Sequence, residues 1–185
     1  MRRILTALAL LAAFPPFALA AKAASSEGKA SIRPTAPPPR LQNAAPSIDA
    51  LIERFLTALE KKDEAALRHL RINEAEYRQI ILPGSVPPGT PRRHYREDVT
   101  EYFWGTMNGK SAGYEKYLID EVGGRGYTKV KSVSYHKGET RYAGYTAYKQ
   151  LRLVVEDAAG EEHEIRTGSI ADLDGQYKFI SFIRD

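Results

Sequence analysis

The sequence predicts an α+β fold, in which N-terminal helices pack on a curved, cone-like antiparallel meander of four strands. Two observations support this prediction. Apolar residues recur at helical spacing between residues 48 and 122, and the period changes to two from Tyr127 onward. The strands follow one another through short turns, which is typical of an antiparallel meander. Because the helices come first and the strands follow as a block, the pattern favours α+β over α/β.

The first segment of the chain predicts export. Residues 1–20 combine Arg2 and Arg3, an apolar run over 4–14 and small residues before Ala21. This pattern is typical of a Sec-type signal peptide cleaved before Ala21, so we expect a periplasmic or secreted protein. The alternative is an uncleaved membrane anchor, but the apolar run is shorter than the roughly 20 residues that span a bilayer. No membrane span is expected after cleavage.

The second segment predicts a flexible linker, and the third predicts a single domain. Residues 21–46 are rich in Ala, Pro and Ser and have neither an amphipathic period nor an aromatic residue. Such a segment buries too little apolar surface to offset its ordering entropy. The alternative is that it serves as a proline-rich ligand for another protein. Residues 47–185 then have the length of one domain.

Composition excludes several classes of function. The chain has a net charge of +4, but six of its 27 basic residues and only one of its 23 acidic residues precede residue 47. The domain therefore carries 21 basic and 22 acidic residues, and its charge does not favour nucleic acid as a partner. The chain contains no cysteine, which excludes disulfides, cysteine catalysis and cysteine-based zinc sites.

Residues 47–84 predict three helices. Ser47 caps the first helix, whose apolar residues form a stripe that faces a core. Asp63 caps a short second helix. Asn73, with Glu76 at capping-box spacing, begins a third helix that ends at Pro83-Gly84. The stripe of the first helix consists of Ile48, Leu51, Ile52, Phe55, Leu56 and Leu59.

A proline- and glycine-rich loop over 83–91 precedes a longer helical region. The loop leads into a basic cluster at 92–96, which could contact an anion at the start of the next helix or could simply be a solvated surface segment. We expect a helix from Val99 to Met107, an interruption at Gly109–Gly113 and a resumed helix over 114–122.

Four strands are predicted in the C-terminal part of the chain. The second has the clearest alternation of the period-two pattern, with Tyr145, Leu151 and Val155 on one face. Asp174-Gly175, between the last two strands, is the strongest hairpin signal in the chain. The predicted strands lie near 127–137, 143–156, 162–172 and 176–184.

The opening helical pair, Ile48 to Leu70, and the terminal strand, Tyr177 to Ile183, resemble the nuclear transport factor 2-like superfamily, also called cystatin-like α+β cones. The resemblance covers roughly 47–185, and the 83–91 loop lengthens the usual helical part. It implies that the helices lie on the concave face of the sheet and leave a conical pocket. Members of the superfamily include isomerases, dehydratases, polyketide cyclases and non-catalytic binding domains, so the fold does not select the function.

The tyrosines provide the main functional signal. All eleven lie in the domain, and five of them crowd into the first two predicted strands. Tyrosine favours half-wet pocket mouths, but it also packs well on an ordinary sheet, and both interpretations stay open. The expected pocket residues are Trp104, Tyr117, Asp120, Tyr145, Thr167 and Ser169, with Asp120 as a possible acid or base.

The remaining motifs point away from a metal or a cofactor. The histidines are His69, His94, His136 and His163, and none lies three or four residues from another. We expect no metal and no cofactor. The leading hypothesis is a non-catalytic exported domain that binds a small apolar or aromatic ligand, or a partner protein, in a tyrosine-rich cone. The alternatives are a cofactor-free lyase or isomerase that uses a pocket carboxylate with Tyr or His, and a structural homodimer formed through the sheet face.

Overall fold

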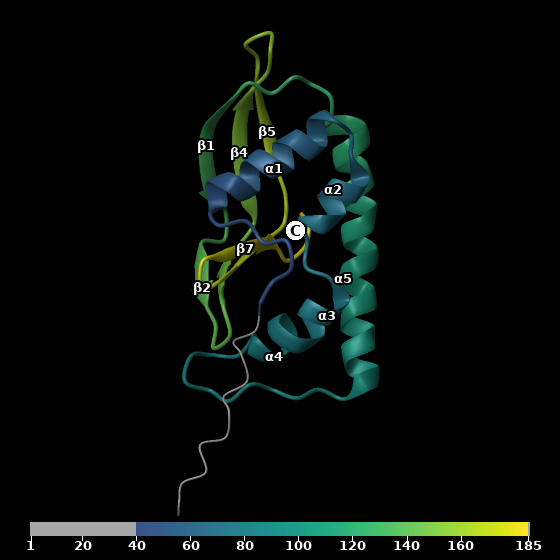
Figure 1. The fold of residues 1–185 in the computed structure, drawn as a ribbon, viewed down its shortest axis with the longest axis vertical. Coiled ribbons are helices and arrows are strands. Elements are labelled where there is room, and N and C mark those ends of the chain that lie inside the picture. The colour runs from purple at the N-terminus through teal and green to yellow at the C-terminus, as the bar shows by residue number, and fades with distance from the viewer. Residues whose placement is uncertain (1–39, 185) are drawn as a thin grey trace, which may run out of the picture. The chain divides into compact units, whose positions relative to one another are not determined.

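The computed structural model describes residues 40–184, in which helices precede two antiparallel sheets (Figure 1). The predicted signal peptide and most of the predicted linker lie outside these residues. The last residues of the predicted linker are packed: Leu41 and Ala45 are buried. Ala45 also exchanges two backbone hydrogen bonds of 2.9 Å with Tyr177. The folded part of the chain therefore begins before Ser47.

The three predicted helix starts are confirmed. Ser47 accepts a hydrogen bond from the amide of Ala50, and Asp63 accepts one from the amide of Ala66. Asn73 forms a capping box, so in each of the three helices a free amide of the first turn is satisfied by the cap side chain. The helical segments are α1 (Ile48–Glu60), α2 (Glu64–His69), α3 (Glu74–Glu76), η1 (Tyr77–Ile81), α4 (Leu82–Gly84), α5 (Glu97–Tyr117) and η2 (Leu118–Val122), with η1 and η2 being π-helical.

The predicted interruption at Gly109–Gly113 is wrong, because α5 runs unbroken from Glu97 to Tyr117. A glycine inside a helix costs only about 1 kcal/mol relative to alanine, which tertiary contacts can offset. One such contact lies in the middle of the segment. The buried Ser111 side chain accepts a hydrogen bond of 2.8 Å from the amide of Phe182, which anchors α5 to the C-terminal end of the domain.

The C-terminal half forms seven strands in two sheets, where four strands in one meander were predicted. One sheet has the order β1-β4-β5 and the other the order β2-β3-β6-β7. Two of the predicted strands are interrupted, at 149–150 and 167–169, and a third break, at 136–138, separates β1 from a strand (β2) that lies between the first two predicted strands. The predicted Asp174-Gly175 hairpin is confirmed. The strands are β1 (Lys129–Tyr135), β2 (Glu139–Arg141), β3 (Thr146–Tyr148), β4 (Leu151–Glu156), β5 (Glu162–Arg166), β6 (Ile170–Leu173) and β7 (Gln176–Phe179).

Two hydrophobic clusters lie between the helices and the sheets. In the larger one, α1 lies across β4 and β5 (Figure 1), and its centre is a triad of fully buried phenylalanines. The ring centroids of Phe55 and Phe179 are 5.1 Å apart, those of Phe179 and Phe182 are 5.1 Å apart, and those of Phe55 and Phe182 are 5.9 Å apart. The triad joins α1, β7 and the C-terminal segment. The smaller cluster contains Tyr77 of η1 and Tyr145.

A buried ion pair ties the short helices to the second sheet. Lys178 of β7 donates to both carboxylate oxygens of Glu76 at 3.2 and 2.8 Å, and both side chains are nearly inaccessible. Glu76 also accepts from the amides of Gln42 and Asn73. Since a buried charge is tolerated only when it is paired and hydrogen-bonded, these contacts fix the position of Glu76.

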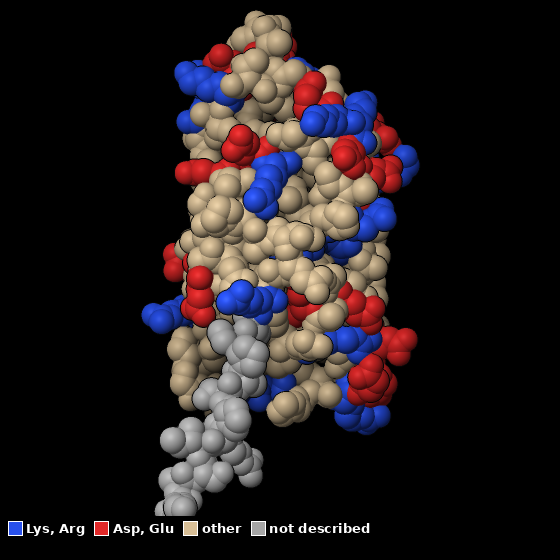
Figure 2. All heavy atoms as spheres, in the orientation of Figure 1, with Lys and Arg blue, Asp and Glu red and all other residues tan. Residues whose placement is uncertain are grey.

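The surface carries both signs of charge. Figure 2 shows lysine and arginine side chains interspersed with aspartate and glutamate over the face that α1 presents. This mixture fits the nearly balanced charge of the domain. Within residues 40–184, no helix combines the length and the apolar character needed to cross a membrane.

Removing one ring of the phenylalanine triad should destabilise the domain strongly. We expect Phe182→Ala to lower the free energy of unfolding by about 3–5 kcal/mol, because it leaves a cavity in the larger cluster. Chemical denaturation followed by circular dichroism measures this change. The control is Phe103→Ala, whose ring is 42% exposed and whose loss should cost about 0.5 kcal/mol or less. Equal costs for the two variants would contradict the role assigned to the triad.

Candidate functional site

The candidate site is a groove between α1 and β1 with a volume of about 480 Å³. Ile52 and Leu56 of α1 and Val130 and Val133 of β1 provide its apolar lining. Both valines remain exposed, at 38% and 36%. The polar residues along the groove are Asp49, Glu53, Thr57, Glu60, Lys61, Thr128 and Lys129.

A β-bulge in β1 places the two valines side by side. Residues that alternate along a regular strand point to opposite faces, so Val130 and Val133 would normally diverge. The register of β1 shifts between Val130 and Ser132, and the two valines therefore lie opposite Val155 and Leu153 of β4. Because directly opposed residues share a face of the sheet, the extra residue brings both valines to the face covered by α1.

Tyr127 lines one end of the groove, next to Glu60. Its hydroxyl donates a hydrogen bond of 2.7 Å to the carbonyl of Val122, and burial raises the pKa of this phenol. Tyr127 therefore stays a neutral donor at physiological pH. Glu60 accepts a hydrogen bond of 2.7 Å from the amide of Gly126, whose φ of +69° favours glycine at this position.

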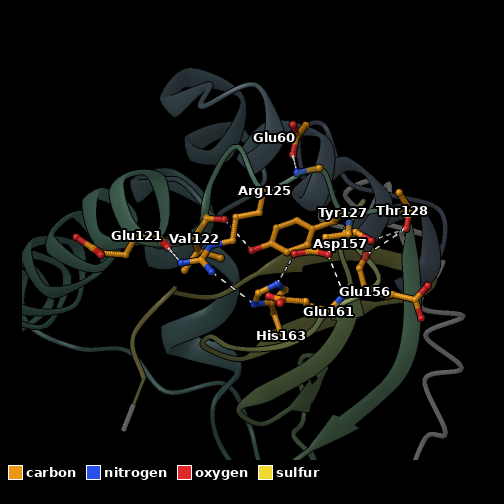
Figure 3. Close-up of polar contacts among 12 residues, drawn as sticks. Glu60, Glu121, Val122, Arg125, Tyr127, Thr128, Glu156, Asp157, Glu161 and His163 are labelled. Carbon is orange, nitrogen blue, oxygen red and sulfur yellow. Dashed lines mark hydrogen bonds and ion pairs between the residues drawn. The ribbon is translucent and has the colours of Figure 1, made fainter.

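A polar cluster lies against the other side of the Tyr127 ring (Figure 3). The ring of His163 packs edge-on to Tyr127, with centroids 6.1 Å apart. Its Nε2 lies 2.7 Å from Oδ2 of Asp157, while its Nδ1 lies 3.5 Å from the guanidinium of Arg125. Asp157 also accepts from the amides of Ala159 and Glu161 at 2.9 Å. The pKa of Asp157 is held below its ordinary value, first by the hydrogen bond from His163 and then by these amides.

The geometry of this cluster fits a structural role better than a metal site. Asp157, Glu161 and His163 have ligand atoms within 4.8 Å of one another. A histidine bound to a metal through Nε2 would donate its Nδ1–H to an acceptor. Here Nδ1 faces the cationic Arg125, which would oppose both that proton and a nearby cation. Both ring nitrogens are engaged, so His163 is also poorly placed to act as a general base. The cluster instead fixes the turn between β4 and β5.

The structure separates the six residues predicted for the pocket. Trp104 packs on Tyr77 at 5.5 Å, and Tyr145, whose hydroxyl lies 2.8 Å from Ser85, belongs to the same cluster. Burial raises the pKa of Tyr145 to about 12. Tyr117 lies 44% exposed on α5.

The other three predicted residues lie in two further places. Asp120 is exposed and pairs with Lys116 at 2.7 Å, so it has neither the burial nor the free carboxylate expected of a catalytic acid or base. Thr167 and Ser169 lie in the interruption between β5 and β6. Among the five cavities described on residues 40–184, none is lined by more than one of the six residues.

The groove residues were missed for an identifiable reason. The periodicity of the sequence places the whole α1 stripe, with Ile52 and Leu56, on the core side. Val130 and Val133 are three residues apart, so a regular strand would point them to opposite faces of the sheet, and no alternation pattern in the sequence places them on one face. Only the pairing register of β1 with β4 shows that they share it.

The Asp157–His163 contact should make stability depend on acid pH. A carboxylate with a lowered pKa stabilises the fold above the ordinary aspartate value of about 4, and this contribution is lost as pH falls through its folded pKa. We therefore expect Asp157→Asn to melt at a lower temperature than the unsubstituted protein at pH 5–7. The difference should shrink below about pH 4. Thermal melts from pH 3 to 7 measure it.

Asp174→Asn, in the exposed turn between β6 and β7, is the matched control for this experiment. Its melting temperature should differ little from that of the unsubstituted protein across the same range. A deficit for Asp157→Asn that stays constant from pH 3 to 7 would show that the carboxylate charge is not the stabilising element.

Comparisons of this chain with protein-family models, with curated proteins and with solved structures found no match.

Proposed function

We propose that this protein is an exported, non-catalytic binding domain whose α1–β1 groove holds a small apolar or aromatic molecule. The observation that carries the proposal is the bulge in β1, which keeps Val130 and Val133 exposed beside Ile52 and Leu56. Exposed apolar groups gathered in one concavity gain free energy when a ligand covers them. The groove volume of about 480 Å³ also lies within the usual range for small-molecule sites, roughly 300–1,000 Å³.

A small molecule suits this groove better than an added β-strand. β1 is an edge strand, and an edge can pair with an extended peptide. Natural sheets block such pairing with bulges and with lysines on the edge. β1 has both devices, a bulge at Lys131 and a second lysine at Lys129. Its backbone is therefore protected, while the apolar lining of the groove remains open.

The charges at the rim restrict the ligand. Three carboxylates line the groove on the α1 side, from Asp49, Glu53 and Glu60, and two ammonium groups from Lys61 and Lys129 oppose them. This balance favours a neutral or cationic molecule over an anion. Tyr127 adds an aromatic ring at one end, against which a planar ligand can pack.

Binding is favoured over catalysis by the state of the carboxylates. General bases that work at neutral pH have raised pKa values. The three carboxylates that line the groove, from Asp49, Glu53 and Glu60, are all exposed, and none has the buried surroundings that a carboxylate base needs. Carboxylates of this kind are weak bases.

We further infer that the two sheets are the halves of one curved, cone-like meander of four bent strands. Backbone hydrogen bonds across the interruptions support this inference, from His136 to Gln150, from Thr167 to Leu151 and from Ile180 to Ser169. Such an arrangement would agree with the resemblance to nuclear transport factor 2-like domains. An experimental structure that lacked these bonds would contradict it.

Export remains part of the proposal because the first 20 residues have the composition of a signal peptide. Expression of the full chain in a Gram-negative host, followed by N-terminal sequencing, tests it. The expected mature protein begins at Ala21, and a retained Met1 would contradict a cleaved signal peptide.

Binding in the groove can be tested with N-phenyl-1-naphthylamine, a neutral dye that fluoresces in apolar surroundings. We expect saturable fluorescence enhancement with the unsubstituted protein. Val133→Asp should weaken the dye affinity at least tenfold, because it places a carboxylate on the apolar lining. Since Val133 is 36% exposed, the variant should still fold, which circular dichroism verifies.

The matched control is Tyr102→Ala, which removes a 68% exposed aromatic side chain from α5, outside the groove. It should bind the dye with unchanged affinity. The proposal fails if the unsubstituted protein gives no saturable signal or if Val133→Asp binds as tightly as the control.

A further inference from the structure

The three strand interruptions lie at the same level of the fold. The first and second are joined by a hydrogen bond of 2.9 Å from the amide of His136 to the carbonyl of Gln150. The second and third are joined by bonds between Leu151 and the segment Thr167–Gly168, at 2.9 and 3.0 Å. Side chains from all three interruptions line a single cavity of about 220 Å³, separate from the α1–β1 groove.

Gln150, which lines this cavity, has a strained backbone and an unpaired side-chain amide. Its φ of +58° lies in the left-handed region, which few residues other than glycine adopt. The residue is only 8% exposed, and its side-chain Nε2 has no hydrogen-bond partner. A buried donor without a partner destabilises a fold unless something binds it. The strained backbone and the free amide together point to a ligand with an acceptor atom.

Three arginines line the same cavity: Arg152, Arg166 and Arg184. Arg152 and Arg166 lie directly opposite each other on β4 and β5, a placement in which like charges repel. Glu164 hydrogen-bonds to both, and no other carboxylate within residues 40–184 does so. Each guanidinium has five N–H donors, so most of these donors remain available.

Arg184 reaches the cavity because the C-terminal segment passes unusually close to Gly168. A Cβ at Gly168 would lie 2.0 Å from the carbonyl oxygen of Ser181, so only glycine permits this approach. Phe182, held in the phenylalanine triad, anchors the same segment. Any side chain at position 168 would therefore displace the C-terminal segment, which supplies Arg184 to the cavity.

We propose that this cavity binds a small oxyanion, the carboxylate or phosphate group of a small molecule. The guanidinium groups match the paired oxygens of either group, and the free amide of Gln150 supplies an uncharged donor from the inner wall. This proposal is independent of the groove, since the two sites differ in charge preference. The groove rim favours neutral or cationic molecules, and the cavity favours anions.

Inorganic phosphate and malonate serve as the two probes, with sodium chloride at matched ionic strength as the reference. We expect at least one probe to raise the melting temperature saturably above the chloride reference, since a ligand that binds only the folded state stabilises it. The stronger of the two identifies the group as phosphate or carboxylate. Isothermal titration on the full chain then gives the affinity.

Three variants separate binding from folding. Arg166→Gln should weaken the anion at least tenfold, whereas Arg54→Gln, which removes the same charge from α1, should leave the affinity unchanged. Gln150→Gly removes the amide but relaxes the backbone, so it should melt at an equal or higher temperature while binding the anion more weakly.

The proposal is overturned if neither probe stabilises the protein beyond chloride. It is also overturned if Arg166→Gln and Arg54→Gln weaken binding equally, since that would be a general charge effect. If Gln150→Gly binds the anion as tightly as the unsubstituted protein, the Gln150 amide does not contact the anion, and the proposal that this cavity is the anion site is overturned.

Discussion

The phenylalanine triad is the contact on which both proposed sites depend. Phe55 belongs to α1, Phe179 to β7 and Phe182 to the C-terminal segment, and their rings meet within 5.9 Å of one another. The position of α1 over the sheet defines one wall of the groove. The position of the C-terminal segment brings Arg184 to the cavity between the strand interruptions. One packed aromatic contact therefore positions a helix and a chain end that are distant in sequence.

The two sites use the same sheet in different ways. In the groove, the bulge of β1 turns two valines to one face and keeps its edge from pairing. In the cavity, interruptions in three neighbouring strands bring the lining side chains together, among them the Gln150 amide donor, which has no partner. Irregular pairing is thus the source of both, in accord with the frequent occurrence of bulges beside functional sites. Their opposite charge preferences allow two separate ligands to be tested on one domain.

Local features could be predicted because they depend on neighbouring residues. The caps at Ser47, Asp63 and Asn73 and the turn at Asp174-Gly175 involve contacts within a few residues, and the structure has each of them. The alternation of Tyr145, Leu151 and Val155 was also visible, and all three are buried. The glycines of α5 misled the prediction, because a propensity of about 1 kcal/mol each is smaller than the packing that holds the helix.

The order of helices before strands, the α+β class and the alternating burial of β4 follow from periodicity and capping, which are properties of the chain itself. The register of β1, the left-handed conformation of Gln150 and the approach of Ser181 to Gly168 follow only from the folded molecule. Each of these three results from a segment meeting another that is remote in sequence. The free energy that selects them resides in long-range pairing and packing, and no local pattern of residue types records it.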